Sequence, residues 1–164
     1  MNGGEAIGET SRSRVLIAYD GSDGAEHALR VTAKLLPESE AIVLYVFSSM
    51  PASLTPLAGM GMPPELDIDT SELERRAAEL ARQGADLATR LGLLGQPTTF
   101  DAAGASGIWS AIIRIAGEQE AGLIVIGSRG RAGLRAALLG SVSNGVVHHA
   151  DRPVLVVPHP DQCC

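Results

Sequence analysis

Four short segments of the chain are apolar at consecutive positions and predict buried strands. They are Val15–Tyr19, Ile42–Phe47, Leu123–Ile126 and Val154–Val157. Runs of this length that are rich in β-branched residues are typical of strands covered on both faces, as in a parallel sheet. A fifth run, Thr98–Phe100, is short and half polar, which indicates an edge strand.

Between these runs, apolar residues recur at the spacing of amphipathic helices, with capping residues before them and Pro or Gly after them. The predicted helices lie between Ser22 or Asp23 and Pro37, between residues 69–71 and Gly92, between Ser106 and Gly122, and after Ser141. Their apolar faces are Ala25, Ala28, Leu29, Thr32, Ala33 and Leu36; Leu73, Ala77, Leu80, Ala81, Leu87 and Leu91; Ile108, Ile112 and Ile115; and Val142, Val146 and Val147. Ser71 and Glu74 have the spacing of a capping box at the second helix.

Strands and helices therefore alternate, which is typical of a doubly wound α/β domain with a parallel sheet and helices on both faces. The 164 residues are enough for one such domain, expected over residues 12–158. Residues 1–11 are expected to form a disordered leader, and residues 159–164 a tail. Ser48–Pro64 holds four prolines and predicts a mobile loop, either a plain connector or a lid.

Composition narrows the classes of function. Hydrophobic residues make up 45% of the chain and aromatic residues 3%, so we expect an aliphatic core. The net charge of −6 argues against a basic nucleic-acid-binding face and against contact with an anionic membrane. No apolar stretch approaches the ~20 residues that span a bilayer, and the N-terminus lacks the apolar core of a secretory signal. We expect a cytoplasmic protein in which the terminal pair Cys163 and Cys164 is inert.

The most informative stretch follows the strand at Leu123–Ile126 and reads GSRGRAGLRAALLGS. Within it, Gly127, Gly130 and Gly140 allow the backbone to approach a ligand closely, and Gly140 allows a sharp turn into the next helix. A helix that begins at Ser141 offers free N–H groups and the positive end of its dipole, which predicts a phosphate site. The nearby arginines Arg129, Arg131 and Arg135 either add positive charge for an anion or form a solvated face.

Ligands of open α/β sheets bind beyond the carboxyl ends of the strands, where the strand order reverses. The first strand ends in Asp20, the second near Val46 and the fourth in Gly127. If the first and fourth strands are neighbours, Asp20 faces the glycine-rich loop. Asp20 has an alternative or additional role as a helix N-cap.

Three features together resemble the universal stress protein family. They are Asp20-Gly21-Ser22 after the first strand, the spacing G-x2-G-x9-G-S from Gly127 to Ser141, and the apolar segment Pro153–Pro158. The similarity covers residues 12–158. The glycine spacing is the pattern of the family's ATP-binding branch, whereas members of the other branch keep the fold without it.

The resemblance implies a five-stranded parallel sheet in the order 3-2-1-4-5 and a site for ATP, AMP or a cyclic nucleotide. In that site, Ala18, Tyr19 and Asp20 would line the adenosine, and Val46 would present backbone to the adenine. Ile126 and Gly127 would border the ribose. The phosphate loop would begin with Arg129 and Gly130, and the phosphates would be bound by N–H and hydroxyl groups of Gly140, Ser141, Val142 and Ser143. Mg2+ would be bound through the phosphates near Asp20, without direct side-chain ligands. The resemblance also implies a homodimer that pairs through Val154–Val157, the exposed edge strand.

The chain shows no set of residues typical of a hydrolytic enzyme. Its single lysine, Lys34, lies in the first helical pattern, so no P-loop lysine reaches a γ-phosphate. His148 and His149 are adjacent in a helix and do not share a face, which makes them a poor metal pair. Trp109 is expected to pack in the core or against a neighbouring helix. We therefore expect nucleotide binding with slow or no hydrolysis.

Two other functions are compatible with this fold. The first is a nucleotide-free dimeric adaptor, against which the intact glycine pattern counts. The second is a phosphoacceptor receiver domain, which needs an acidic cluster at the first strand and a late lysine. Asp20 stands alone and the late lysine is missing, so Asp101 after the weak strand is the one point in favour.

Overall fold

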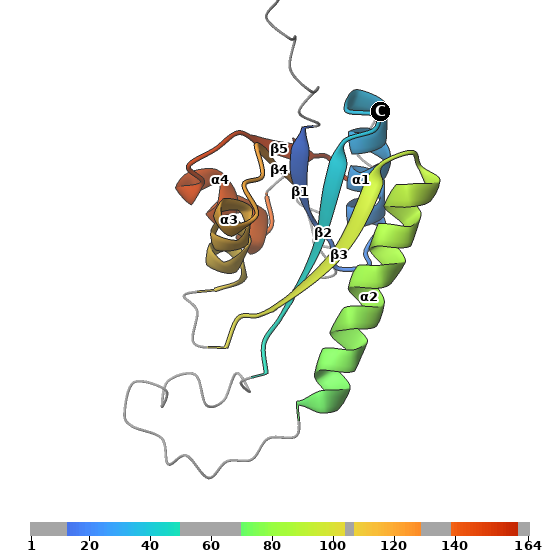
Figure 1. Ribbon diagram of the computed structural model, residues 1–164. Helices are drawn as coiled ribbons and strands as arrows, with labels where there is room; N and C mark the ends of the chain where they lie inside the picture. The colour runs from blue at the N-terminus through green and yellow to red at the C-terminus, as the bar shows by residue number, and fades with distance from the viewer. Residues whose placement is uncertain (1–12, 50–69, 104–106, 129–138, 161–164) are drawn as a thin grey trace, which may run out of the picture.

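The computed structural model of the protein describes residues 13–49, 70–103, 107–128 and 139–160. Strands and helices alternate along them (Figure 1): β1 (Arg14–Ala18), α1 (Asp23–Leu35), β2 (Glu40–Phe47), α2 (Ser71–Arg90), β3 (Leu94–Asp101), α3 (Ile108–Glu118), β4 (Leu123–Gly127), α4 (Ser141–His149) and β5 (Val154–Val157). The expected leader and most of the Ser48–Pro64 loop lie outside the described residues, as does the end of the expected tail.

The five strands form one parallel sheet in the order β3-β2-β1-β4-β5. The predicted fold class and strand order are confirmed. The chain moves outward from β1 to β2 and β3, then returns to place β4 on the other side of β1. The strand order therefore reverses between β1 and β4. β3 and β5 are the edge strands, as the half-polar run and the terminal position of β5 predict.

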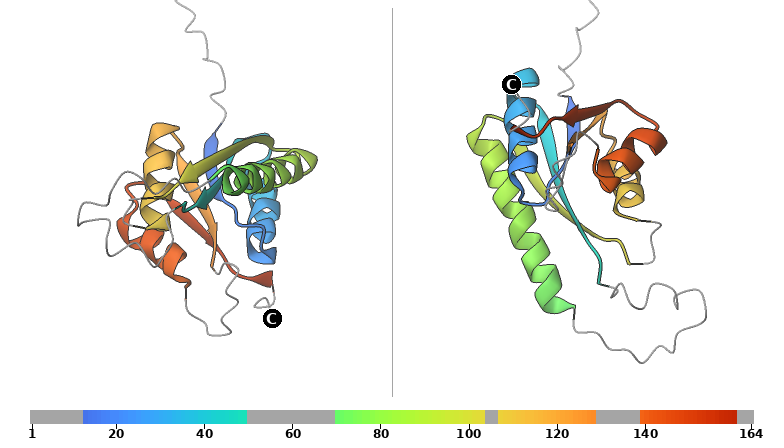
Figure 2. Two further views of the ribbon diagram at one scale, coloured as in Figure 1. Left: turned by 90° about the horizontal axis from the view of Figure 1, so that it is seen from below. Right: turned by 180° about the vertical axis from the view of Figure 1, so that it is seen from behind.

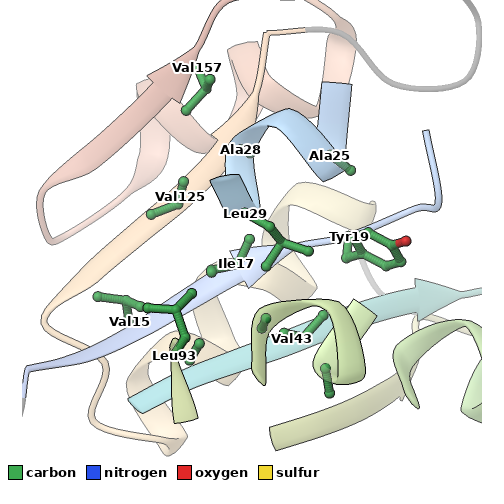
Figure 3. Packing of buried hydrophobic residues seen from close by; sticks show 13 residues of the cluster. Val15, Ile17, Tyr19, Ala25, Ala28, Leu29, Val43, Leu93, Val125 and Val157 are labelled. Carbon is green, nitrogen blue, oxygen red and sulfur yellow. The ribbon is translucent and has the colours of Figure 1, made fainter. Parts of the chain in front are cut away.

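Two layers of helices cover the sheet, α1 and α2 on one face and α3 and α4 on the other (Figure 1; Figure 2). The layers enclose two separate cores. The α1–α2 cluster contains Val15, Ile17, Tyr19, Ala25, Ala28, Leu29, Ala41, Val43, Ala85, Ala88, Leu93, Val125 and Val157 (Figure 3). The α3–α4 cluster contains Leu16, Ile42, Leu44, Ile112, Ile115, Ala116, Ala121, Ile124, Ile126 and Val146. Neighbouring β1 residues alternate between the two clusters, because successive side chains of a strand point to opposite faces.

Helix α2 packs against the sheet through small residues. Its buried residues are Ala77, Ala81, Gly84, Ala85 and Ala88. A Cβ added at Gly84 would lie 2.8 Å from both the Tyr19 ring and a Val43 methyl group. The helix backbone is thus as close to β1 and β2 as the side chains of those strands permit.

Several sequence predictions about single residues are wrong. β3 covers eight residues rather than three, since its polar positions lie at the edge of the sheet and Pro97 is tolerated there. Ser71 does not form a capping box: Thr70 is the N-cap of α2, and its hydroxyl donates to Glu74 at 2.8 Å. Leu73, Ile108 and Val147, expected on buried faces, are exposed. Smaller residues take the buried positions of α2 and α3, such as Ala111 on α3.

The predictions for Ser22 and Trp109 are confirmed. Ser22 caps α1, accepting from the Ala25 N–H at 3.2 Å. Trp109 packs against a neighbouring helix, with its ring stacked on His149 of α4 at a centroid distance of 4.4 Å. In the part of the chain that the structure describes, no helix has the length and apolar character that a bilayer span requires.

The close packing of α2 predicts that Gly84→Ala destabilises the protein although alanine favours helix. The new methyl group meets two buried side chains, so overpacking should lower the free energy of unfolding by about 1–3 kcal/mol. Urea unfolding followed by circular dichroism measures this. Gly117→Ala is the matched control, because its Cβ meets only the end of the Arg152 side chain at 3.4 Å. Equal stability of the two variants would contradict the close approach of α2.

Candidate functional site

Strand β1 ends before its two neighbours at the carboxyl edge of the sheet. Its register with β2 ends at Ala18 opposite Leu44, and the Tyr19 N–H donates to the Leu44 carbonyl at 2.9 Å. β2 continues to Phe47 and β4 to Gly127. This edge lies where the strand order reverses, the place at which doubly wound domains bind their ligands.

The backbone of Val46 faces the space beyond the end of β1. In a strand, the N–H and C=O of one residue point toward the same neighbouring strand. The next residue points toward the opposite neighbour, so residues two apart share one direction. Leu44 accepts from Tyr19 on the β1 side, whereas Phe47 accepts from Ala102 on the β3 side at 2.7 Å. The polar backbone groups of Val46 therefore point past the last paired residue of β1. They form a hydrogen-bond donor and acceptor next to each other.

Ser128 joins the end of β4 to the start of α4. Its carbonyl accepts the Gly140 N–H at 2.8 Å and the Ser143 hydroxyl at 3.0 Å. Its N–H donates to the Val157 carbonyl at 2.7 Å, and its hydroxyl accepts the His159 N–H at 3.2 Å. Ser128 is buried, and its hydrogen bond with the Ser143 hydroxyl is shielded from water. These hydrogen bonds hold the first turn of α4 at the carboxyl end of β4.

The first turn of α4 carries backbone N–H groups without a side-chain cap. Gly140 is the N-cap and has no side chain that could accept from them. Its carbonyl accepts the Asn144 N–H at 2.9 Å, which is the first hydrogen bond of the helix. The N–H groups of Ser141, Val142 and Ser143 precede it, at the positive end of the helix dipole. This arrangement suits an anion.

Gly140 has a different importance from the one expected. Its φ of −62° and ψ of 160° are extended-region values that any residue adopts, so the turn into α4 does not require glycine. Glycine differs from other residues at this position only in having no Cβ next to the N–H groups of the first turn. The Ser143 hydroxyl, expected as a donor to phosphate, is buried and bonded to the carbonyls of Ser128 and Gly140. Only the backbone N–H of Ser143 is thus suited to that role.

Asp20 lies at the turn between β1 and α1. Its carboxylate accepts the Ser22 N–H at 3.0 Å, and Ser22 rather than Asp20 is the helix N-cap. The Tyr19 side chain lies elsewhere, within the α1–α2 cluster, where Figure 3 shows its ring on the same side of the sheet as Leu29. Burial raises the pKa of Tyr19, with smaller contributions in the same direction from Glu26 and Asp20. The Tyr19 side chain is therefore part of the core on the α1–α2 face of the sheet.

The other side chains expected to line the site lie together on the opposite face. Ala18, Val46 and Val142 pack against the α3–α4 cluster, of which Ile126 is a buried member. The structure thus brings the ends of β1, β2 and β4 and the start of α4 to one apolar surface. Arg129 and Gly130, like Arg131 and Arg135, lie outside the described residues.

Asp101 is a polar residue of this edge whose structural importance the sequence analysis missed. It is the last residue of β3, and its carboxylate accepts the N–H groups of Ser49 at 3.0 Å and Ala103 at 2.9 Å. Burial would raise the pKa of Asp101, but the hydrogen bonds from Ser49 and Ala103 outweigh it and lower the pKa. The strand pattern contained one signal, an acidic residue directly after a strand. It did not reveal the partner, which is 52 residues away.

Metal binding through side chains alone has no support at this edge. Within the described ranges, no group of three or more His, Cys, Asp or Glu residues is arranged to hold a metal ion. A cation here would need ligands from a bound molecule, which is how Mg2+ is commonly held by phosphates.

Comparisons with a family model and with known sequences identify one protein family. Residues 11–158 match the universal stress protein family. The universal stress protein YxiE of Bacillus subtilis (strain 168) is 32% identical over 149 residues, which cover 88% of this chain and 98% of YxiE. Among solved structures, the hypothetical protein PH0823 has a TM-score of 0.66 and 28% identity over 92% of this chain and 98% of its own. The universal stress protein from Archaeoglobus fulgidus in complex with dAMP has a TM-score of 0.57 and 23% identity over 88% and 96%, which shows a shared fold.

The hydrogen bonds of Ser128 predict that Ser143→Ala destabilises the protein. The variant removes a buried hydroxyl from two carbonyl acceptors, which should lower the free energy of unfolding by about 1 kcal/mol. Chemical denaturation measures the change. Ser141→Ala, at an exposed position of the same helical turn, is the control and should leave stability close to the wild-type value. A Ser143→Ala variant as stable as Ser141→Ala would show that the Ser128 junction contributes little.

Proposed function

Because the chain belongs to the universal stress protein family, we propose that it is a regulatory protein that binds an adenine nucleotide at the carboxyl ends of β1 and β4. ATP is the proposed ligand, with AMP or a cyclic nucleotide as alternatives that the same site would accept. Nucleotide occupancy would alter the shape or the partners of the protein. The cytoplasmic location expected from the sequence stays a prediction.

The observation that carries the proposal is the uncapped first turn of α4. Its N–H groups follow a glycine N-cap and are held beside β4 by the Ser128 hydrogen bonds. A phosphate group placed there would accept from the N–H groups of Ser141, Val142 and Ser143 without a Cβ at Gly140 in its way. Arg129 and Gly130 belong to the proposed phosphate loop on the sequence pattern alone.

Adenine is the base that the other end of the site favours. The backbone of Val46 offers a donor and an acceptor side by side, and adenine has the complementary N1 acceptor and N6 donor on one edge. Ala18, Ile126 and Val142 supply apolar surface, against which a flat base and its ribose would lie. The dAMP found in the Archaeoglobus fulgidus protein supports an adenine nucleotide as the class of ligand.

The residues present fit Mg2+ bound through phosphates. The Asp20 carboxylate is partly exposed at the end of β1, where it would attract the hydrated ion while accepting the Ser22 N–H. We propose slow or no hydrolysis, since the single lysine of the chain, Lys34, lies within α1 and the sequence has no P-loop lysine.

A nucleotide-free dimeric adaptor is the second candidate function. It rests on β5, an apolar edge strand whose Val154, Leu155 and Val156 are partly exposed. We propose that two copies pair through Val154–Val157 in either case, because a bare apolar edge favours pairing with another chain. The adaptor differs from the favoured function in needing no nucleotide.

The proposed site predicts micromolar binding of ATP with Mg2+ that Gly140→Val and Asp20→Ala weaken by about tenfold or more, each through the loss of contacts to phosphate or metal. Isothermal titration calorimetry on the purified protein measures the affinities. The φ and ψ of Gly140 are values that valine can adopt, so no backbone strain is expected in Gly140→Val.

Asp86→Ala is the matched control, because this carboxylate lies on the exposed face of α2 in an ion pair with Arg82. It should bind ATP like the wild type. Wild-type protein that binds no adenine nucleotide, and that carries none after purification as judged by native mass spectrometry, would leave the adaptor as the function.

The exposed edge of β5 predicts that the protein is a dimer at micromolar concentration. Val156→Lys should shift it to the 17.0 kDa monomer, because a charge at the strand edge opposes pairing. Analytical ultracentrifugation distinguishes the two species. A wild-type protein that sediments as a monomer would contradict the proposed pairing.

A further inference from the structure

Asp101 connects the carboxyl ends of β2 and β3. The parallel register of the two strands ends with Phe47 opposite Asp101, and the Ala102 N–H donates to the Phe47 carbonyl at 2.7 Å. Beyond that bond the chain leaves β2 through Ser48 and Ser49. There, hydrogen bonds to the Asp101 side chain replace the hydrogen bonds between the two strand backbones.

Both oxygens of the Asp101 carboxylate accept hydrogen bonds. Oδ1 accepts the N–H groups of Ser49 at 3.0 Å and Ala103 at 2.9 Å, and Oδ2 accepts the Ser49 hydroxyl. An ionised carboxylate only accepts hydrogen bonds and therefore suits three donors. The lowered pKa of Asp101 agrees with an ionised carboxylate at neutral pH. The Asp101 side chain thus fixes Ser49, the second residue after β2.

This fixed segment directly follows the backbone that faces the proposed base. The N–H and C=O of Val46 point beyond the end of β1, so no β1 residue sets their direction. On the other side, β2 is held by β3 up to Phe47, and then by Asp101 through Ser49. The Val46 donor and acceptor are therefore held by the β2–β3 ladder and lie three residues before Ser49, the point at which Asp101 fixes the chain that follows.

We infer that Asp101 is a positioning residue that sets the base preference of the nucleotide site by fixing the backbone of Val46 through Ser49. The inference rests on the proposed function and assigns a specificity role to a residue that would not touch the nucleotide. It also assigns a role to a charged group that lies partly buried at the end of an edge strand.

Inosine triphosphate is the probe that separates base reading from phosphate binding. Hypoxanthine has a carbonyl at C6 and an N–H at N1, so its donor and acceptor are reversed relative to adenine. The sugar and the phosphates are the same as in ATP. The ratio of the dissociation constants for ITP and ATP therefore measures how well the Val46 donor and acceptor match adenine.

The experiment compares wild-type protein with Asp101→Ala, Asp101→Asn and Ser49→Ala in calorimetric titrations with ATP and ITP. Asp101→Ala should reduce the preference for ATP by about tenfold, the worth of one to two aligned hydrogen bonds, and leave the affinity for ITP unchanged. Asp101→Asn should keep most of the preference, because its amide oxygen still accepts and its amide nitrogen can donate to the Ser49 hydroxyl. Ser49→Ala should give an intermediate loss.

A second measurement needs no nucleotide. Amide hydrogen exchange of residues 45–49 should accelerate in Asp101→Ala and remain near wild type in Asp101→Asn and in the surface control Asp86→Ala. Thermal unfolding of each variant establishes that the domain is folded, and Asp101→Asn and Ser49→Ala retain a test if Asp101→Ala unfolds.

The outcomes separate the inference from the proposed function. An unchanged ratio of ITP to ATP dissociation constants in Asp101→Ala overturns the inference, and so does equal weakening of both nucleotides. Either result leaves nucleotide binding itself in place. Wild-type protein that binds neither ATP nor ITP overturns the proposed function, and the base preference with it.

Discussion

The hydrogen bonds of Ser128 are the interaction on which the candidate site depends. One buried residue bonds through its N–H to β5, through its carbonyl to the first turn of α4, and through its hydroxyl to the segment after β5. Packing of Val146 and Val142 holds the body of α4, and the Ser128 bonds hold its N-terminus at the end of β4. An anion site made of backbone N–H groups works only when those groups are held in place before the ligand arrives.

The strand order provides the other half of the arrangement. Because β2 and β4 both extend beyond the end of β1, the backbone of Val46 is left facing outward at the level where α4 begins. The two faces of the sheet also differ in the residues that they carry. Tyr19 and the small residues of α2 form one core, and Ala18, Val46 and Ile126 leave an apolar surface on the other. Position along β1 alone decides which residue contributes to which face.

The start of α4 at Ser141 could be predicted because its signals are local in sequence. Glycines after a buried strand, followed by a helix start at Ser141, indicate a phosphate site by their order alone. Asp101 and Ser128 could not be found in this way. Their partners are distant in sequence: Ser49 lies 52 residues from Asp101, and His159 lies 31 residues from Ser128. Hydrogen-bond partners of that kind leave no periodic pattern.

The sequence by itself determined the fold class, the strand order through its resemblance to a family, and the motif that begins α4. Apolar periodicity reports which segments must be covered, and this is a property of each segment alone. Tertiary structure decided the rest: the close approach of α2 at Gly84, the internal bonding of the Ser143 hydroxyl and the burial of Tyr19 away from the site. These depend on distances between elements, which packing sets and no single segment encodes.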